Sequence, residues 1–300
     1  MRRIDVKITF QCNNYCQFCV QGNKRDRFAP KTLRQVVDFL KKSRAEGYQE
    51  VVFTGGEPTV HPDLLKMISA ARKLGFFTQI QTNGRTFAYK DFCQKLIALG
   101  VNQFSPSLHG ASATTHDFLT SAPGSFDQVT QGIKNLKDLN QQVITNSVIT
   151  TSNYKELPQL AELLVSLRVD QFQLAFIHVA GTAAVNKDWL VPKKTEIMPF
   201  VKRALDIGLK AGATVMTEAI PYCLMRGYEA YIAEKIIPQA KIMDSDFVLE
   251  DYTKYRQSEG KAKGPLCVKC KHYKICEGPW REYPEIFGWD EFKPVKKRSR

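Results

Sequence analysis

The chain has 300 residues, of which 43% are hydrophobic, and its formal net charge is +13. This length and apolar content suffice for a large domain with a substantial core and exclude a disordered chain, while the positive charge favours acidic partners and leaves nucleic acid open. No apolar run reaches the roughly 18–20 residues of a membrane span, and the N-terminus lacks the apolar stretch of a secretory signal, so we expect a cytoplasmic protein without membrane contact.

Short β-branched and aromatic runs alternate with amphipathic helical patterns up to about residue 210. The predicted strands are Asp5–Phe10, Glu50–Thr54, Phe76–Thr82, Val101–Ser107, Gln142–Ile149 and Gln171–Val179. The predicted helices are Thr32–Gly47, Asp63–Leu74, Asp91–Leu99, Phe126–Leu139 and Glu156–Leu167. This order predicts an α/β fold with a parallel sheet, either a partial (β/α)6 barrel of the triosephosphate isomerase type or an open doubly wound sheet. Both place ligands beyond the C-terminal ends of the strands.

The pattern changes in the last third of the chain. Thr214–Glu218 fits one more strand, and from Asp251 the chain is polar and then rich in cysteine. We expect a barrel over residues 1–212, a small cysteine-rich cap over residues 213–292 that is organised by metal, and a basic tail over residues 293–300.

Eight cysteines are unevenly placed along the chain. Three lie in the loop after the first predicted strand, Cys12-Asn-Asn-Tyr-Cys16-Gln-Phe-Cys19. A short loop of this C-x3-C-x2-C spacing can give three thiolates to three irons of a cubane and leave the fourth iron open. Zinc sites use paired C-x2–4-C knuckles, so zinc fits this loop poorly. Cys93 lies in a helical pattern and is expected to be a buried, small apolar residue.

The second predicted strand runs directly into Gly55-Gly56-Glu57-Pro58. Two glycines let backbone carbonyls approach a ligand closely, Glu57 adds negative charge for an ammonium group, and Pro58 stiffens the exit of the turn. Alone, this sequence is typical of an ordinary turn. It is informative because it follows the cysteine loop by one strand–helix unit.

Together, the C-x3-C-x2-C loop and the Gly-Gly-Glu-Pro turn resemble those of the radical S-adenosylmethionine (SAM) superfamily. The resemblance implies a partial barrel and a [4Fe–4S] cluster held by Cys12, Cys16 and Cys19, whose open iron chelates SAM. An electron from the cluster then cleaves SAM to methionine and a 5′-deoxyadenosyl radical, which abstracts hydrogen from the substrate.

The same resemblance implies which other residues contact SAM. Gly55, Gly56, Glu57 and Pro58 form the turn at its amino group, and Thr82 and Asn83 match a Thr-Asn-Gly loop beside the ribose. Ser107 matches a position that bonds ribose hydroxyls, and Asn146 one near the SAM carboxylate. Phe18 and Ile177 are expected beside the adenine.

The second cysteine group, Cys267-x2-Cys270-x5-Cys276, resembles part of the SPASM and Twitch extensions of radical SAM enzymes. Those extensions bind auxiliary [4Fe–4S] clusters, and Cys223 could supply the fourth ligand here. The alternative is a zinc ion held by the same three cysteines with His272 or Cys223.

These resemblances predict a radical SAM oxidoreductase with a SAM-binding cluster and an auxiliary cluster. Its expected reaction is oxidation or crosslinking of a peptide, with a precursor peptide as partner and an acidic flavodoxin or ferredoxin as electron donor. Modification of a nucleotide or cofactor precursor is the second enzymatic reading. A non-catalytic zinc protein that binds nucleic acid is the third, although the sequence shows no recognition helix or stacking motif.

Overall fold

The computed structural model describes residues 2–296 of the chain. Its strands are β1 (Arg3–Thr9), β2 (Glu50–Gly55), β3 (Phe77–Thr82), β4 (Gln103–Pro106), β5 (Ile144–Ile149), β6 (Gln171–Phe176), β7 (Thr214–Glu218), β8 (Ala240–Met243) and β9 (Val248–Leu249). Its helices are α1 (Leu33–Ala45), α2 (Leu64–Lys73), α3 (Lys90–Ala98), α4 (Ala113–Thr120), α5 (Ser125–Asp138), α6 (Leu157–Ser166), α7 (Thr182–Val185), α8 (Lys187–Leu190), α9 (Lys194–Lys210), α10 (Tyr252–Tyr255) and α11 (Glu282–Phe287). None of the helices within these residues combines the length and apolar character needed to cross a membrane.

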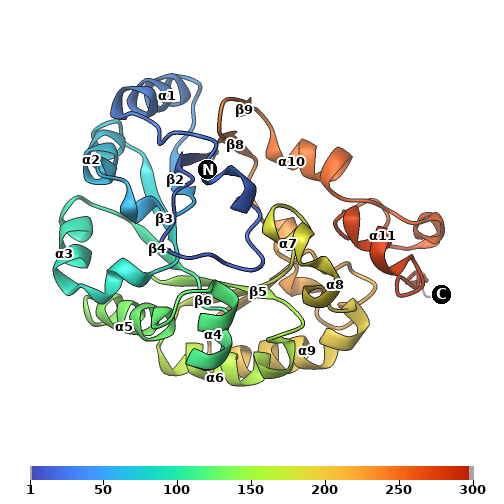
Figure 1. The fold of residues 1–300 in the computed structure, drawn as a ribbon. Coiled ribbons are helices and arrows are strands. Elements are labelled where there is room, and N and C mark those ends of the chain that lie inside the picture. Colours follow the sequence, from blue (N-terminus) through green and yellow to red (C-terminus); the bar gives the residue numbers. More distant parts are fainter. Residues whose placement is uncertain (1, 297–300) are drawn as a thin grey trace.

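The strands form two sheets that continue one another around a curved wall (Figure 1). One sheet has the order β4-β3-β2-β1-β8-β9 and the other β5-β6-β7, and single bridges join β4 to the chain at β5, Phe104 to Val143 and Ser107 to Asn146. Every pair is parallel except β8 with β9. Within residues 2–296, β7 and β8 are not paired, so the barrel is partial.

Alternation along each strand separates an outer apolar face from a polar interior. On β1, Ile4, Val6 and Ile8 are fully buried in the hydrophobic core, while Asp5 and Lys7 point to the other face. Helices lie outside the wall in Figure 1 and cover the apolar face. Helix α1 shows why these segments are helical. The Thr32 side chain accepts from the Gln35 backbone N–H and the Gln35 side chain accepts from the Thr32 backbone N–H, a capping box ahead of an apolar stripe.

The predicted α/β barrel is confirmed, and each predicted strand and helix has an observed counterpart. Eight elements were not predicted: α4, α7, α8, α9, α10, α11, β8 and β9. Strand β8 pairs with β1 and β9, and β7 pairs with β6, so three strands beyond residue 213 belong to the two sheets. The boundary at residue 213 stays a prediction about which residues fold as a unit.

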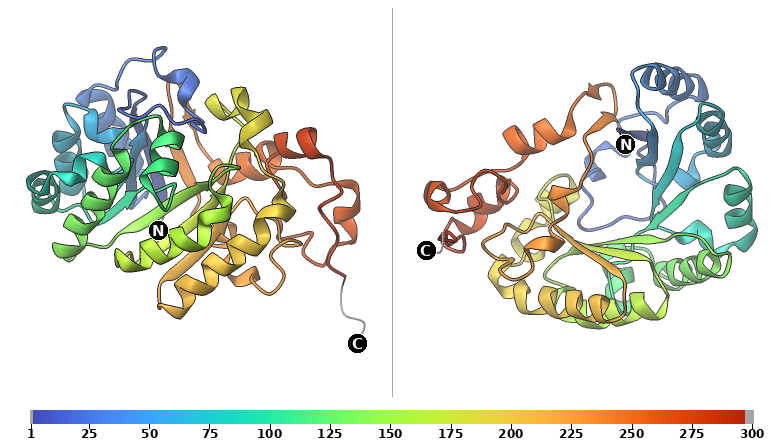
Figure 2. Two further views of the ribbon diagram at one scale, coloured as in Figure 1. Left: turned by 60° about the horizontal axis from the view of Figure 1, so that its bottom comes forward. Right: turned by 180° about the vertical axis from the view of Figure 1, so that it is seen from behind.

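The C-terminal segment lies beside the barrel in both views of Figure 2 and carries α10 and α11. Trp280 and Tyr283 are buried, and the Tyr283 ring lies 5.4 Å from that of Phe176 on β6. The predicted basic tail begins against this segment, because the Lys271 N–H donates to the Val295 carbonyl at 2.8 Å. Residues 297–300 of that tail lie outside the described residues.

Candidate functional site

The first cysteine loop follows β1 and is held from two sides. The backbone N–H groups of Tyr15 and Gln17 donate to carbonyls at the end of α4, at 2.8 Å and 2.9 Å. On the other side, the Arg85 guanidinium donates to the Asn13 carbonyl and, at 3.0 Å, to the Asn14 side chain. In Figure 1 the loop runs across the mouth of the barrel towards α7, where the Thr182 N–H donates to the Cys19 carbonyl at 2.8 Å. The loop is therefore fixed at the C-terminal ends of the strands.

The three thiols of this loop are free, partly buried and close enough to affect one another. Burial raises the pKa of the Cys12 thiol to about 11, and burial also raises the pKa of Cys16, with further contributions from the neighbouring Cys19 and Cys12 thiolates. The pKa of Cys19 is likewise raised by burial. Such thiols release their protons only when a cation compensates the buried negative charge. The donor set thus fits a metal cluster.

The Gly-Gly-Glu-Pro turn after β2 lies against the base of the cysteine loop. The Gly56 N–H donates to the Thr9 carbonyl at 2.7 Å, and the Glu57 N–H donates to the Gln11 carbonyl at 2.8 Å. A Cβ atom on Gly56 would lie 2.4 Å from the Gln11 carbonyl oxygen and 2.5 Å from that of Phe10. A close approach to the protein's own backbone therefore requires glycine here, and the approach to a ligand stays a prediction.

Glu57 has no exposed surface, and its carboxylate is used inside the protein. One oxygen accepts from the Thr59 backbone N–H at 2.9 Å and from the Thr82 hydroxyl at 2.7 Å, and the other accepts from the Asn83 backbone N–H at 2.6 Å. Burial raises the pKa of this carboxyl group, and the donors oppose that rise. Glu57 therefore joins the turn after β2 to the loop after β3, and its contact with an ammonium group stays a prediction.

The other predicted SAM contacts lie along the same edge of the sheet. Asn83 donates from its side chain to the Asn13 side chain at 2.6 Å and to Cys12 Sγ at 3.8 Å. The Ser107 N–H donates to the Thr82 carbonyl at 3.0 Å. Asn146, across a bridge from Ser107, accepts from Gln173 at 3.4 Å. The remaining predicted residues, Pro58, Phe18 and Ile177, are buried.

Two further residues contact the cysteine loop, and one of them, Arg85, was not predicted from the sequence. Arg85 follows the Thr-Asn-Gly loop directly and braces the cysteine loop. The His109 ring lies 4.5 Å from the Phe18 ring, and its Nδ1 accepts from the Val148 N–H at 3.1 Å, so its Nε2 carries the proton. The position of Arg85 beside a recognised motif was an available signal, but the role of His109 depends on tertiary packing.

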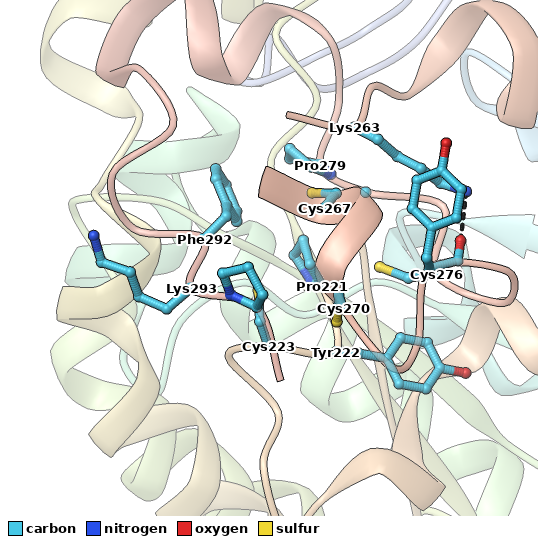
Figure 3. Close-up of a pocket in the computed structure, with 13 residues that line it drawn as sticks. Pro221, Tyr222, Cys223, Lys263, Cys267, Cys270, Cys276, Pro279, Phe292 and Lys293 are labelled. Carbon is cyan, nitrogen blue, oxygen red and sulfur yellow. Dashed lines mark hydrogen bonds between the residues drawn. The ribbon is translucent and has the colours of Figure 1, made fainter. Parts of the chain in front are cut away.

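The second cysteine group lines a pocket within the cap, together with Cys223 from the segment after β7 (Figure 3). The pocket has a volume of about 410 Å³ including its mouth, and Cys223, Cys267, Cys270 and Cys276 all line it. Burial raises the pKa of Cys223 to about 12, with contributions from the other three thiolates. Two segments separated by more than forty residues of chain thus bring four free thiols to one place.

Within residues 2–296, no group of three or more His, Cys, Asp and Glu side chains is arranged to hold a metal ion. The four cysteines of the cap are a donor set found both in iron–sulfur clusters and in structural zinc sites.

A buried charged network connects the cap pocket to the interior of the barrel. Glu277, next to Cys276, accepts from Arg256 at 2.6 Å and 2.8 Å and lies 3.2 Å from the Lys261 ammonium. Lys261 also pairs with Glu234. Burial raises the pKa of Glu218 on β7, and the nearby cations Lys261 and Arg256 oppose that rise.

A family model described as "Radical SAM superfamily" matches residues 6–164. A curated relative from Saccharolobus solfataricus, "Probable GTP 3',8-cyclase", is 31% identical over 179 residues, and relatives from Saccharolobus islandicus match equally. That match covers 59% of this chain and 57% of the relative, so the similarity extends over little more than half of either protein.

Solved structures share the fold of nearly the whole chain. Streptococcus suis SuiB bound to S-adenosylmethionine superposes with a TM-score of 0.68 at 17% identity, over 92% of this chain and 72% of SuiB. SuiB bound to precursor peptide SuiA superposes with a TM-score of 0.69 at 18% identity, over 92% of this chain and 71% of SuiB. The protein anSMEcpe with bound AdoMet superposes with a TM-score of 0.67 at 14% identity, over 94% of this chain and 89% of anSMEcpe.

Proposed function

The chain belongs to the radical SAM superfamily, and from this premise we propose that it is an oxidoreductase with two iron–sulfur sites that modifies a peptide. Membership makes it an enzyme of the radical SAM class and implies a [4Fe–4S] cluster with SAM as cofactors. We propose three things beyond membership: which cysteines bind the first cluster, that a second cluster is present, and that the substrate is a peptide.

Cys12, Cys16 and Cys19 would hold the first cluster. This assignment is supported by the spacing of the three thiols and by their mutual proximity. It is also supported by their burial, because buried thiolates are stabilised by a bound cation. When bound, this cluster supplies the electron that cleaves SAM to a 5′-deoxyadenosyl radical, which takes a hydrogen atom from the substrate.

The surrounding residues fix the loop and exclude water. Arg85 and Asn83 hold the backbone and side chain of Asn13, and Glu57 joins the two turns beneath the loop. Phe18 and His109 form a buried aromatic wall beside Cys19. We assign Glu57 a positioning role, because its oxygens already accept four hydrogen bonds within the protein.

The interior of the barrel suits a polar substrate. Gln79 donates to Ser105 at 2.6 Å, and Gln173 donates to Glu218 at 2.6 Å. These side chains project from the strand faces opposite the apolar core and offer amide, hydroxyl and carboxyl groups. Peptide groups present the complementary donors and acceptors.

The observation that carries this proposal is the pocket lined by four cysteines in the cap. Cys223, Cys267, Cys270 and Cys276 would hold the auxiliary cluster, as a single-cluster extension of the Twitch type. SuiB has a precursor peptide as its ligand in one structure, and its fold covers both the barrel and most of the cap of this chain. Peptide oxidation or crosslinking, with an acidic flavodoxin or ferredoxin as electron donor, follows as the proposed activity.

The second candidate is modification of a nucleotide, favoured by the 31% identity to a probable GTP 3',8-cyclase. An anaerobic assay with GTP and SAM separates the two candidates. We expect 5′-deoxyadenosine to form without conversion of GTP. Conversion of GTP would make the nucleotide the substrate class.

The auxiliary site is tested by Cys270→Ala, with Cys93→Ala as the matched control. Cys93 is a fully buried cysteine whose thiol donates to the Phe87 carbonyl, away from both cysteine groups. After anaerobic reconstitution, the Cys270 variant should hold about half the wild-type iron and still form 5′-deoxyadenosine, while the control keeps all its iron. Full iron in the Cys270 variant, or zinc in the native protein, would contradict the auxiliary cluster.

A further inference from the structure

The surface of the cap around its cysteine pocket is both basic and apolar. Four apolar side chains there are exposed by 42–65%: Leu266, Val268, Tyr273 and Ile275. The same stretch of chain also carries four exposed lysines: Lys263, Lys269, Lys271 and Lys274. We call these eight residues the lysine surface.

No negative charge interrupts the lysine surface in the sequence. Residues 260–276 contain five lysines and no aspartate or glutamate. The carboxylate that follows, Glu277, is bound to Arg256 and Lys261 and adds no free negative charge. The surface therefore attracts an acidic partner across a distance set by the ionic strength, about 8–10 Å in ordinary buffers.

The lysine surface meets the cysteine pocket at two of its residues. Lys263 and Tyr273 line the pocket together with the four cysteines. The Lys263 ammonium donates to the Tyr273 carbonyl at 2.7 Å, as drawn in Figure 3, and lies 4.5 Å from the centre of the Tyr273 ring. A partner that contacts these two residues would lie beside the pocket.

We propose that the lysine surface docks an acidic electron-carrier protein beside the auxiliary site, an inference that rests on the proposed function of that site. Small interfaces with apolar centres and charged rims are typical of transient redox complexes, in which electrostatic complementarity sets the association rate. Three of the four exposed apolar side chains are aliphatic. They suit a protein surface better than nucleic acid bases, which stack on aromatic rings.

The test measures binding of a purified flavodoxin to the anaerobically reconstituted holoenzyme at low ionic strength, by biolayer interferometry. The variant is Lys269→Glu/Lys271→Glu/Lys274→Glu. The control is Lys41→Glu/Lys73→Glu/Lys90→Glu, which reverses three exposed lysines on α1, α2 and α3 and changes the net charge equally. A second variant, Val268→Ser/Ile275→Ser, removes apolar contact without changing charge.

We expect the first variant to weaken flavodoxin binding by about tenfold or more, the control by less than about threefold, and added salt to weaken the wild-type complex. The serine variant should raise the dissociation rate. Equal weakening by variant and control would overturn the proposal, as would binding of a single-stranded RNA oligonucleotide in place of flavodoxin through the same lysines. Iron content of each variant, measured beside binding, separates a failed docking surface from a missing cluster.

Discussion

Replacing Gly56 with alanine tests whether the turn after β2 supports the cysteine loop. The added methyl group would lie 2.4 Å from the Gln11 carbonyl oxygen and 2.5 Å from that of Phe10. Both contacts are with backbone atoms, so no side chain can rotate away. Gly56 does not have a positive φ, so the whole cost is steric and none is conformational.

The loss of stability can be estimated from the contacts that break when the turn after β2 moves away from the cysteine loop. Relief of the overlap breaks the hydrogen bonds from the Gly56 and Glu57 N–H groups to the base of the loop, 2.7 Å and 2.8 Å long. Two such bonds contribute about 2 kcal/mol, and overpacking a tight site costs about 1–3 kcal/mol more, so we expect a loss of about 3–5 kcal/mol. For comparison, the free energy of unfolding of a whole folded domain is about 5–15 kcal/mol.

The assay is urea denaturation followed by circular dichroism, together with iron content after reconstitution. The control is Gly212→Ala at the end of α9, where a Cβ meets nothing within 4 Å but φ is +78°. That control should lose only about 1–2 kcal/mol and keep its iron. Gly56→Ala with the stability and iron content of the wild type would refute the packing argument.

Two further predictions concern stability. Arg256→Met should destabilise the protein by about 3–5 kcal/mol, because it leaves the buried Glu277 carboxylate with Lys261 as its remaining cation, and limited proteolysis should then begin in the cap. Arg256→Met that resists denaturant and protease like the wild type would contradict this. Burial lowers the pKa of His116 from 6.5 to about 4, so between these values the unfolded chain binds a proton that the folded chain does not. The His116 contribution to stability should therefore fall as the pH is lowered through this window, by about 2 kcal/mol at pH 5. His116→Gln should reduce the slope of stability against pH in a denaturation series, although buried His109, whose pKa is also lowered, keeps part of it. An unchanged slope would count against this prediction.

The sequence predicted the elements that repeat a regular pattern. Strands with alternating apolar residues and helices such as α1, with its cap and apolar stripe, were found with small shifts at their ends. Strand β8 was missed because it has four residues and its stabilisation comes from pairing with β1, more than two hundred residues away in the chain. No local pattern reports such a pairing.

In the candidate site, the sequence identified the right segments but not every role. The cysteine loop, the Gly-Gly-Glu-Pro turn and the Thr-Asn-Gly loop lie together as expected. The interior role of Glu57 was not predicted, because it depends on burial and on donors from Thr82 and Asn83. Charge in a motif suggests a ligand contact, whereas the hydrogen bonds that this carboxylate accepts within the protein are seen only in the fold.

The most direct test compares two anaerobically reconstituted variants, Cys12→Ala/Cys16→Ala/Cys19→Ala and Cys270→Ala, for iron content and 5′-deoxyadenosine formation. We expect each variant to lose about half of the wild-type iron, since each removes one of two four-iron clusters. Only the first should lose SAM cleavage. Undiminished 5′-deoxyadenosine from the triple variant would contradict the assignment of these three cysteines as ligands of the SAM-binding cluster.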